Sequence, residues 1–259
     1  MTHSIQPIVF SLKHISVSIN GKEILKNISL DIYQGDFIII VGGNGAGKST
    51  LFDVIGGKRS FEGAGDIIYE NKSIKLMSEV KRAHFITRIF QNTHTNCVGS
   101  LSVLENIALS IMKIDEYGFS LADSREIRKK AEAVLRDLDM PLSLLSVPMF
   151  SLSGGQRQLL SFMMSMFLCP NILLLDEPTA ALDPQAATKL LMWAKKCIAE
   201  RGIIALLITH DPYIAMHLGN RLCILEDGQI KKIFDEDEKK KIIDPAALLG
   251  KIDYEKLSQ

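Results

Sequence analysis

The sequence predicts an α/β fold made of a core of buried strands and helices, an N-terminal antiparallel β subdomain and an inserted α-helical subdomain. Three observations predict it. Alternating apolar residues fill 9–33, short apolar runs of strand length recur at 37–41 and 172–175, and helical patterns dominate 92–168. Within a single domain over 1–259, the expected bounds are 1–91 and 169–259 for the core with its β subdomain, and 92–168 for the helical subdomain.

The N-terminal segment has the pattern of a β-hairpin. Apolar residues alternate over 15–19 and again over 28–32, and Asn20-Gly21 between them is a hairpin turn signal. The run Phe37–Val41 that follows is entirely apolar and rich in β-branched residues, which is typical of a strand buried on both faces of a parallel sheet. The further core elements that we expect are strands 66–69, 84–90, 172–175, 203–208 and 222–225, and helices 186–201 and 212–218.

The central section has helical signals. Ser102 and Glu105 form the pattern of a capping box, which opens a helix that we expect to run to Lys113. A second helix is expected over 124–138, with one apolar face. That face comprises Ile127, Ala131, Val134, Leu135 and Leu138.

Composition excludes several classes of protein. Thirty basic and thirty acidic side chains cancel, so no net charge draws the chain to nucleic acid or anionic lipid. The four cysteines have no metal-ligand spacing and are expected to be free thiols, and no signal peptide is evident. Residues 158–175 carry no charge, but Pro170-Asn171 interrupts them, so we expect a helix and then a buried strand instead of a membrane span. The charged run 235–241 is expected to be a solvated surface segment.

A phosphate-binding loop lies between the strand at 37–41 and a helix expected at 49–55. Residues 42–50 read GGNGAGKST and match G-x-x-x-x-G-K-[ST]. Backbone N–H groups and the helix dipole would hold the phosphates of a nucleoside triphosphate. Lys48 would reach the β- and γ-phosphates, and the Ser49 hydroxyl would bind Mg²⁺. The core is therefore expected to be that of a P-loop NTPase.

Two further motifs extend this chemistry. Asp176 and Glu177 end a buried strand, where an open α/β sheet binds its ligands. Asp176 would hold Mg²⁺, and Glu177 could orient the water that attacks the γ-phosphate. The string Leu152–Gln156 (LSGGQ) opens a helix with free N–H groups and is a second anion site, which suits the nucleotide of a neighbouring subunit.

The order of these motifs, with Gln91, Ala181-Leu-Asp183 and His210 after a strand, resembles the nucleotide-binding domain of ABC transporters over about residues 10–230. The resemblance implies a head-to-tail homodimer with ATP and Mg²⁺ between the subunits. It implies catalytic roles for Glu177, His210 and Gln91, and Mg²⁺ contacts for Ser49, Gln91 and Asp176. The nucleotide contacts that it implies are Gly42, Asn44, Gly45, Ala46, Gly47, Lys48, Ser49, Thr50, Ser153, Gly154, Gly155, Gln156 and Asp183.

The chain departs from the family pattern at Ile19. The family usually has an aromatic residue near the end of the first β-rich segment, where it stacks on adenine, and Ile19 stands there. The resemblance therefore leaves the adenine contact open.

The function that we expect is ATP hydrolysis that powers a separate integral membrane permease. The subunit would lie on the cytoplasmic face of the membrane, linked indirectly to an extracytoplasmic solute-binding protein. Segments 90–92, 101–106 and 141–145 resemble prokaryotic importer subunits assigned to aromatic amino acids (tryptophan or tyrosine). The alternative is an ABC ATPase of a soluble assembly complex that serves no transporter.

Overall fold

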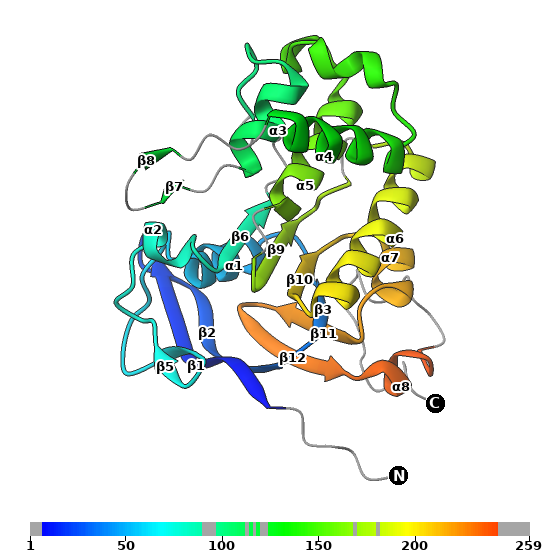
Figure 1. Cartoon of the computed structure of the whole chain (residues 1–259). Helices are drawn as coiled ribbons and strands as arrows, with labels where there is room; N and C mark the ends of the chain where they lie inside the picture. Colours follow the sequence, from blue (N-terminus) through cyan, green and yellow to red (C-terminus); the bar gives the residue numbers. More distant parts are fainter. Residues whose placement is uncertain are drawn as a thin grey trace. The chain divides into compact units, whose positions relative to one another are not determined.

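The computed structural model describes residues 7–89, 97–111, 114–115, 118–119, 124–167, 170–179 and 182–242. The chain divides into two compact units (Figure 1). The first unit comprises residues 1–88, 171–177 and 195–259, and the second comprises residues 89–170 and 178–194.

The predicted N-terminal hairpin is present in the first unit. Strands β1 (Ile8–Ile19) and β2 (Lys22–Tyr33) pair antiparallel. Asn20 and Gly21 between them both have positive φ, 51° and 77°, as a tight turn between twisted strands requires. With β4 (Asp66–Tyr69) and β5 (Lys72–Ser73) they form a four-stranded sheet in the order β2-β1-β4-β5.

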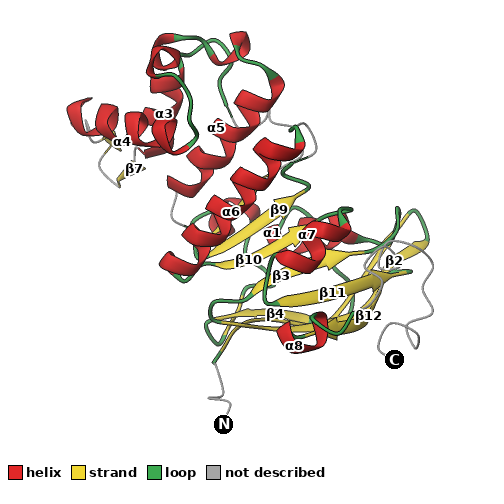
Figure 2. Ribbon diagram, turned by 90° about the vertical axis from the view of Figure 1, so that its right-hand side faces the viewer, coloured by secondary structure: helices red, strands yellow, loops and turns green. Residues whose placement is uncertain are grey.

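The first unit contains a six-stranded sheet in the order β12-β11-β3-β10-β9-β6, of which Figure 2 shows β12, β11, β3, β10 and β9 side by side. Strands β11, β3, β10 and β9 pair parallel in that order, and β12 pairs antiparallel with β11. The strand bounds are β3 Phe37–Val41, β6 Ile86–Ile89, β9 Ile172–Asp176, β10 Ile204–Ile208, β11 Arg221–Glu226 and β12 Gln229–Phe234. The helices of this unit are α1 (Lys48–Gly56), α2 (Glu79–Arg82), α7 (Pro212–His217) and α8 (Glu236–Lys239).

The second unit is mainly helical. It contains α3 (Val103–Ile111), α4 (Ser124–Asp137), α5 (Gly154–Phe167) and the part of α6 (Pro184–Arg201) up to Ala194. Its shorter elements are β7 (Ile114–Asp115), β8 (Gly118–Phe119) and the 3-10 helices η2 (Leu142–Ser146) and η3 (Met149–Ser151).

The predicted start of α3 and the apolar face of α4 are both confirmed. The Ser102 hydroxyl accepts a hydrogen bond from the Glu105 N–H, and the Glu105 carboxylate accepts one from the Ser102 N–H. Met112 and Lys113, at the expected end of α3, lie outside the described residues. All five residues of the predicted α4 face are buried.

The structure also bears on the membrane and cysteine predictions. Among the described helices, none is long and apolar enough to cross a bilayer. Cys97, Cys197 and Cys223 are not in disulfide bonds, and Cys169 lies outside the described residues.

The prediction that residues 235–241 form a solvated segment is wrong for Lys239. Asp235 and Glu238 make a capping box that starts α8, and this turn of helix carries Lys239 into the protein, where it is 3% exposed. Its ammonium donates hydrogen bonds to the carbonyls of Leu218 and Gly219, at the end of α7. Burial lowers the pKa of Lys239 to about 8. The hydrogen bonds to carbonyls that have no partner within the helix therefore offset the cost of removing the Lys239 ammonium from water.

Arg82 anchors the far end of α1. The side chain is 3% exposed, and it donates hydrogen bonds to the carbonyls of Val54 and Ile55 in the last turn of α1. It also donates to the carbonyls of Ile74, Lys75 and Met77. One guanidinium thus fixes the helix that follows the glycine-rich loop.

We predict that Arg82→Met lowers the free energy of unfolding by about 3 kcal/mol, because it leaves several buried carbonyls without a donor. Urea denaturation measures this loss. Arg59→Met, at an exposed position just beyond α1, is the matched control and should change stability little. Equal effects of the two substitutions would contradict the anchoring role of Arg82.

Candidate functional site

Three neighbouring parallel strands end at the same level. In the β3-β10-β9 ladder, Ile208 pairs with Ile40 on one side and with Asp176 on the other. The residues that follow β3, β9 and β10 therefore emerge together at the carboxyl edge of the sheet. These are the glycine-rich loop, Glu177 and the Thr209-His210 pair.

The glycine-rich loop needs glycine at its two ends. A Cβ at Gly42 would lie 2.0 Å from the carbonyl oxygen of Leu225, so no larger residue fits there. Gly47 is the N-cap of α1 with φ 101°, and a Cβ there would lie 2.7 Å from Leu25 Cδ2. No side chain caps this helix. Its first N–H groups have no intrahelical acceptors, so they can hold an anion.

Lys48 lies folded inside the loop. Its ammonium is 2.8 Å from the carbonyl oxygen of Gly42 and 3.0 Å from that of Gly43. Burial lowers the pKa of Lys48 from its ordinary value, and the charges of Glu177 and Asp176 oppose this shift. Triphosphate oxygens would supply a stronger partner for the buried ammonium than the two carbonyls do.

Glu177 and His210 form a pair. Glu177 Oε1 lies 2.8 Å from His210 Nε2, and the two side chains are 27% and 40% exposed. The Glu177 backbone has φ 47°, which is uncommon for a residue other than glycine, and its N–H bonds to the Ile208 carbonyl. The turn after β9 thus directs the carboxylate toward the end of β10.

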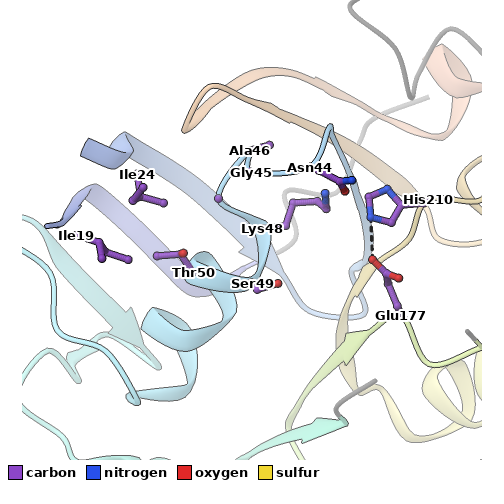
Figure 3. Close-up of a pocket in the computed structure, with 11 residues that line it drawn as sticks. Ile19, Ile24, Asn44, Gly45, Ala46, Lys48, Ser49, Thr50, Glu177 and His210 are labelled. Atoms are coloured by element: carbon purple, nitrogen blue, oxygen red, sulfur yellow. Dashed lines mark ion pairs between the residues drawn. The ribbon is translucent and has the colours of Figure 1, made fainter. Parts of the chain in front are cut away.

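These groups share one open pocket of about 340 Å³. Figure 3 shows Ile19 and Ile24 on one side of the glycine-rich loop, and Glu177 with His210 on the other. The pocket thus offers an apolar wall, a phosphate-binding loop and a carboxylate–imidazole pair in sequence. Its lining comprises Ile19, Ile24, Asn44, Gly45, Ala46, Gly47, Lys48, Ser49, Thr50, Glu177 and His210.

Asp176 has a fixed partner. Its Oδ2 lies 2.8 Å from Arg88 Nη2, and Arg88 Nη1 lies 2.5 Å from Asp53 Oδ1 on α1. The described residues contain no cluster of three or more His, Cys, Asp or Glu side chains that could bind a metal alone. One hydroxyl at Ser49 and one carboxylate at Asp176 nevertheless fit Mg²⁺, which usually takes few protein oxygens together with phosphates and waters.

Several predicted site residues lie in the second unit. The Ser153 hydroxyl accepts a hydrogen bond from the Gln156 N–H, and the Gln156 side chain accepts one from the Ser153 N–H. Ser153 thus caps α5, whose first residues are Gly154 and Gly155. Asp183 caps α6, because its carboxylate accepts from the N–H groups of Gln185 and Ala186. Gln91 and Ala181 lie outside the described residues.

The sequence prediction did not include three residues of this region. Ile24 lines the pocket beside Ile19, and the alternation along the second hairpin strand offered a weak signal for it. Arg88 and Asp53 lie next to Asp176 through contacts between distant parts of the chain, for which no local pattern exists.

The chain matches the family model described as "ABC transporter" over residues 25–180. It is 35% identical over 236 residues to a tyrosine transport ATP-binding protein of Clostridioides difficile (strain R20291), covering 89% of this chain and 91% of the relative. It is 34% identical to the spermidine/putrescine import ATP-binding protein PotA of Thermotoga maritima, covering 86% of this chain and 57% of that protein. Among solved structures, the dimeric ATP-binding cassette MJ0796 with ADP and Pi aligns with a TM-score of 0.74 at 27% identity, covering 88% and 98% of the two chains.

The fold and the loop define an ATP-binding cassette that hydrolyses ATP. The chain belongs to the ABC transporter family.

We predict that Ile19→Tyr strengthens ATP binding by up to about tenfold, because an aromatic face adds roughly 0.5–1.5 kcal/mol to the apolar contact that isoleucine already makes. Because Ile19 offers the base an apolar contact but no aromatic face, the wild-type chain should discriminate poorly between ATP and GTP. Competition with a fluorescent ATP analogue measures both affinities.

Ile8→Tyr is the matched control, since Ile8 is exposed at the other end of β1 and does not line the pocket. If Ile19→Tyr binds ATP no better than Ile8→Tyr, the base does not lie against Ile19.

Proposed function

We propose that this chain is the ATP-hydrolysing subunit of an importer and that it powers a separate membrane permease. One observation carries the proposal. A single pocket contains the phosphate-binding loop, Lys48 and the Glu177–His210 pair, which are the groups needed to hold a triphosphate and to activate water. The whole chain would act as one ABC ATPase domain.

The contacts of the pocket residues suggest a role for each of them in binding and hydrolysing ATP. N–H groups from Asn44 to Thr50 would hold the phosphates, and Lys48 would exchange its two loop carbonyls for β- and γ-phosphate oxygens. Because His210 engages only Oε1 of Glu177, the other oxygen could accept a hydrogen bond from the attacking water. His210 would donate its Nε2–H to the γ-phosphate in place of Glu177 Oε1.

Ser49, Asp176 and Gln91 would hold Mg²⁺. When bound, the ion neutralises charge on the phosphate oxygens. Ser49 would contribute its hydroxyl, and the Asp176 carboxylate would bind through water with the oxygen that Arg88 leaves free.

The LSGGQ motif at residues 152–156 supports a head-to-tail dimer of two such subunits. A helix start at Ser153–Gln156, with its hydroxyl and two glycines, is suited to bind phosphate. Each subunit would therefore bind the nucleotide held by its partner's loop, with Asp183 communicating between the two sites. The likeness to MJ0796, which forms a dimer with ADP and Pi, supports this arrangement.

Closure and opening of the dimer would drive the permease. The subunit would lie on the cytoplasmic face of the membrane, with Gln91 linking the ATP site to the permease, and a solute-binding protein would deliver the solute from outside. The rival function is an ABC ATPase of a soluble assembly complex. Co-purification with a polytopic membrane protein distinguishes the two functions.

The solute would be a small molecule, and we favour an aromatic amino acid. The support is the likeness to the tyrosine transport ATP-binding protein. The similarly related PotA is named for spermidine and putrescine, which is consistent with the solute being selected by the permease and binding protein instead of this subunit. Uptake of labelled tyrosine by cells with and without the gene tests the choice.

We predict that Glu177→Gln lowers ATP turnover by at least about a hundredfold, because the amide cannot act as a base. ATP affinity should be retained, since the loop and Lys48 are intact. The variant should accumulate as an ATP-bound dimer, which size-exclusion chromatography with ATP detects. Glu200→Gln, at an exposed position on α6, is the control and should retain full turnover.

Wild-type turnover by Glu177→Gln would remove this residue from the mechanism. Loss of ATP binding in the same variant would instead show that the substitution damages the site.

We predict that Ser153→Arg abolishes turnover without preventing ATP from binding at Lys48, because arginine at this helix start would obstruct the partner's phosphates. Mixing this variant with Lys48→Ala should restore partial turnover. Each mixed dimer then has one composite site that carries neither substitution. Phosphate release in the mixture, compared with each variant alone, measures this complementation.

Ser102→Arg is the matched control, since it disrupts the capping box of α3 in the same unit. It should lower stability but leave turnover measurable without mixing. High turnover by Ser153→Arg alone would contradict a site shared between subunits.

A further inference from the structure

The Arg88 guanidinium joins two carboxylates, one on α1 and one at the end of β9. Arg88 Nη1 pairs with Asp53 Oδ1 at 2.5 Å, and Arg88 Nη2 pairs with Asp176 Oδ2 at 2.8 Å. The three side chains are only 12%, 20% and 15% exposed. The guanidinium carbon also lies 5.6 Å from the centre of the buried Phe52 ring. Arg88 on β6 therefore connects α1 with the end of β9.

Asp53 places one end of this bridge on the helix that carries Ser49. Asp53 follows Ser49 by four residues on α1, so the two side chains lie on the same helix face, one turn apart. Asp176 ends β9 beside Glu177. The bridge thus fixes the distance between the helix that carries the Ser49 hydroxyl and the strand that carries the Asp176 carboxylate.

Fold stability alone accounts poorly for this arrangement. The three side chains are mostly buried, and a buried ion pair is weak evidence for stability because the cost of desolvation offsets the attraction between the charges. The planar Arg88 guanidinium binds the two carboxylates through different nitrogens, so it fixes their direction and the spacing between them. A lysine ammonium, which acts as a single point charge, cannot do this. The bridge contacts Asp176 through Oδ2, on the side of the carboxylate that faces Arg88.

We propose that Arg88 is a positioning residue that sets the spacing between Ser49 and Asp176 for a nucleotide-bound divalent cation, with Asp53 as its anchor on α1. The inference rests on the proposed function of the same pocket. Arg88 itself would not contact the nucleotide. The bridge acts through Asp176 and α1.

The test measures how much Mg²⁺ strengthens ATP binding. The dissociation constant of a fluorescent ATP analogue is determined with EDTA and with saturating Mg²⁺, and their ratio gives the coupling between metal and nucleotide. We expect Arg88→Lys to lower this ratio by about tenfold, as loss of residues that orient metal ligands does elsewhere. Affinity in EDTA should stay at the wild-type value, because the loop and Lys48 are unchanged.

Two further variants complete the design. Asp53→Asn should also lower the ratio, and the double variant should be no worse than Arg88→Lys, because both changes break one bridge. Arg59→Lys, on an exposed residue just beyond α1, should keep the wild-type ratio. Thermal denaturation of each variant verifies that it is folded.

A wild-type ratio in folded Arg88→Lys and Asp53→Asn, even with a lowered melting temperature, would overturn the proposal and leave a purely structural ion pair. A raised ratio would also overturn it, since Arg88 would then compete with the cation for Asp176. If the wild-type chain itself shows no gain from Mg²⁺, the metal site of the proposed function fails as well.

Discussion

Hydrogen bonds between the parallel strands β3, β10 and β9 bring Ile40, Ile208 and Asp176 level with one another. Because side chains at the carboxyl edge of a sheet are placed by strand register, this pairing decides which groups meet above it. It brings the loop after β3, Glu177 after β9 and His210 after β10 to one pocket. A shift of one strand would separate the phosphate-binding loop from the carboxylate–imidazole pair.

The pocket combines several features that lower the stability of the ligand-free protein and that a bound ligand would stabilise. Gly42 and Gly47 forgo side-chain packing so that the backbone can come close to Leu225 and Leu25. Lys48 is 7% exposed and is bonded to carbonyls of its own loop. A desolvated ammonium, uncapped helix N–H groups and a backbone with positive φ at Glu177 are each unfavourable alone. A triphosphate bound at the loop would satisfy the first two together.

The sequence predicted the elements of the core well because their signals are local. The all-apolar runs became the buried strands β3 and β9, and Asn20-Gly21 became the hairpin turn. It missed β12, whose lysines at 231 and 232 obscured the alternation, and it placed Lys239 in solvent although tertiary contacts bury it. Contacts across distant segments, such as that of Arg88 with Asp176, leave no sequence pattern, whereas the glycine loop and the Asp176-Glu177 pair do.

In the proposed function, the carboxyl edge of this sheet would hold the γ-phosphate of ATP between Lys48 and the Glu177–His210 pair. A crystal structure of the wild-type chain with Mg²⁺ and a non-hydrolysable ATP analogue tests it most directly. We expect the γ-phosphate to lie within hydrogen-bond distance of Lys48 Nζ and His210 Nε2, with the base against Ile19 and Ile24. Phosphates bound away from the glycine-rich loop would show that this pocket is not the ATP site.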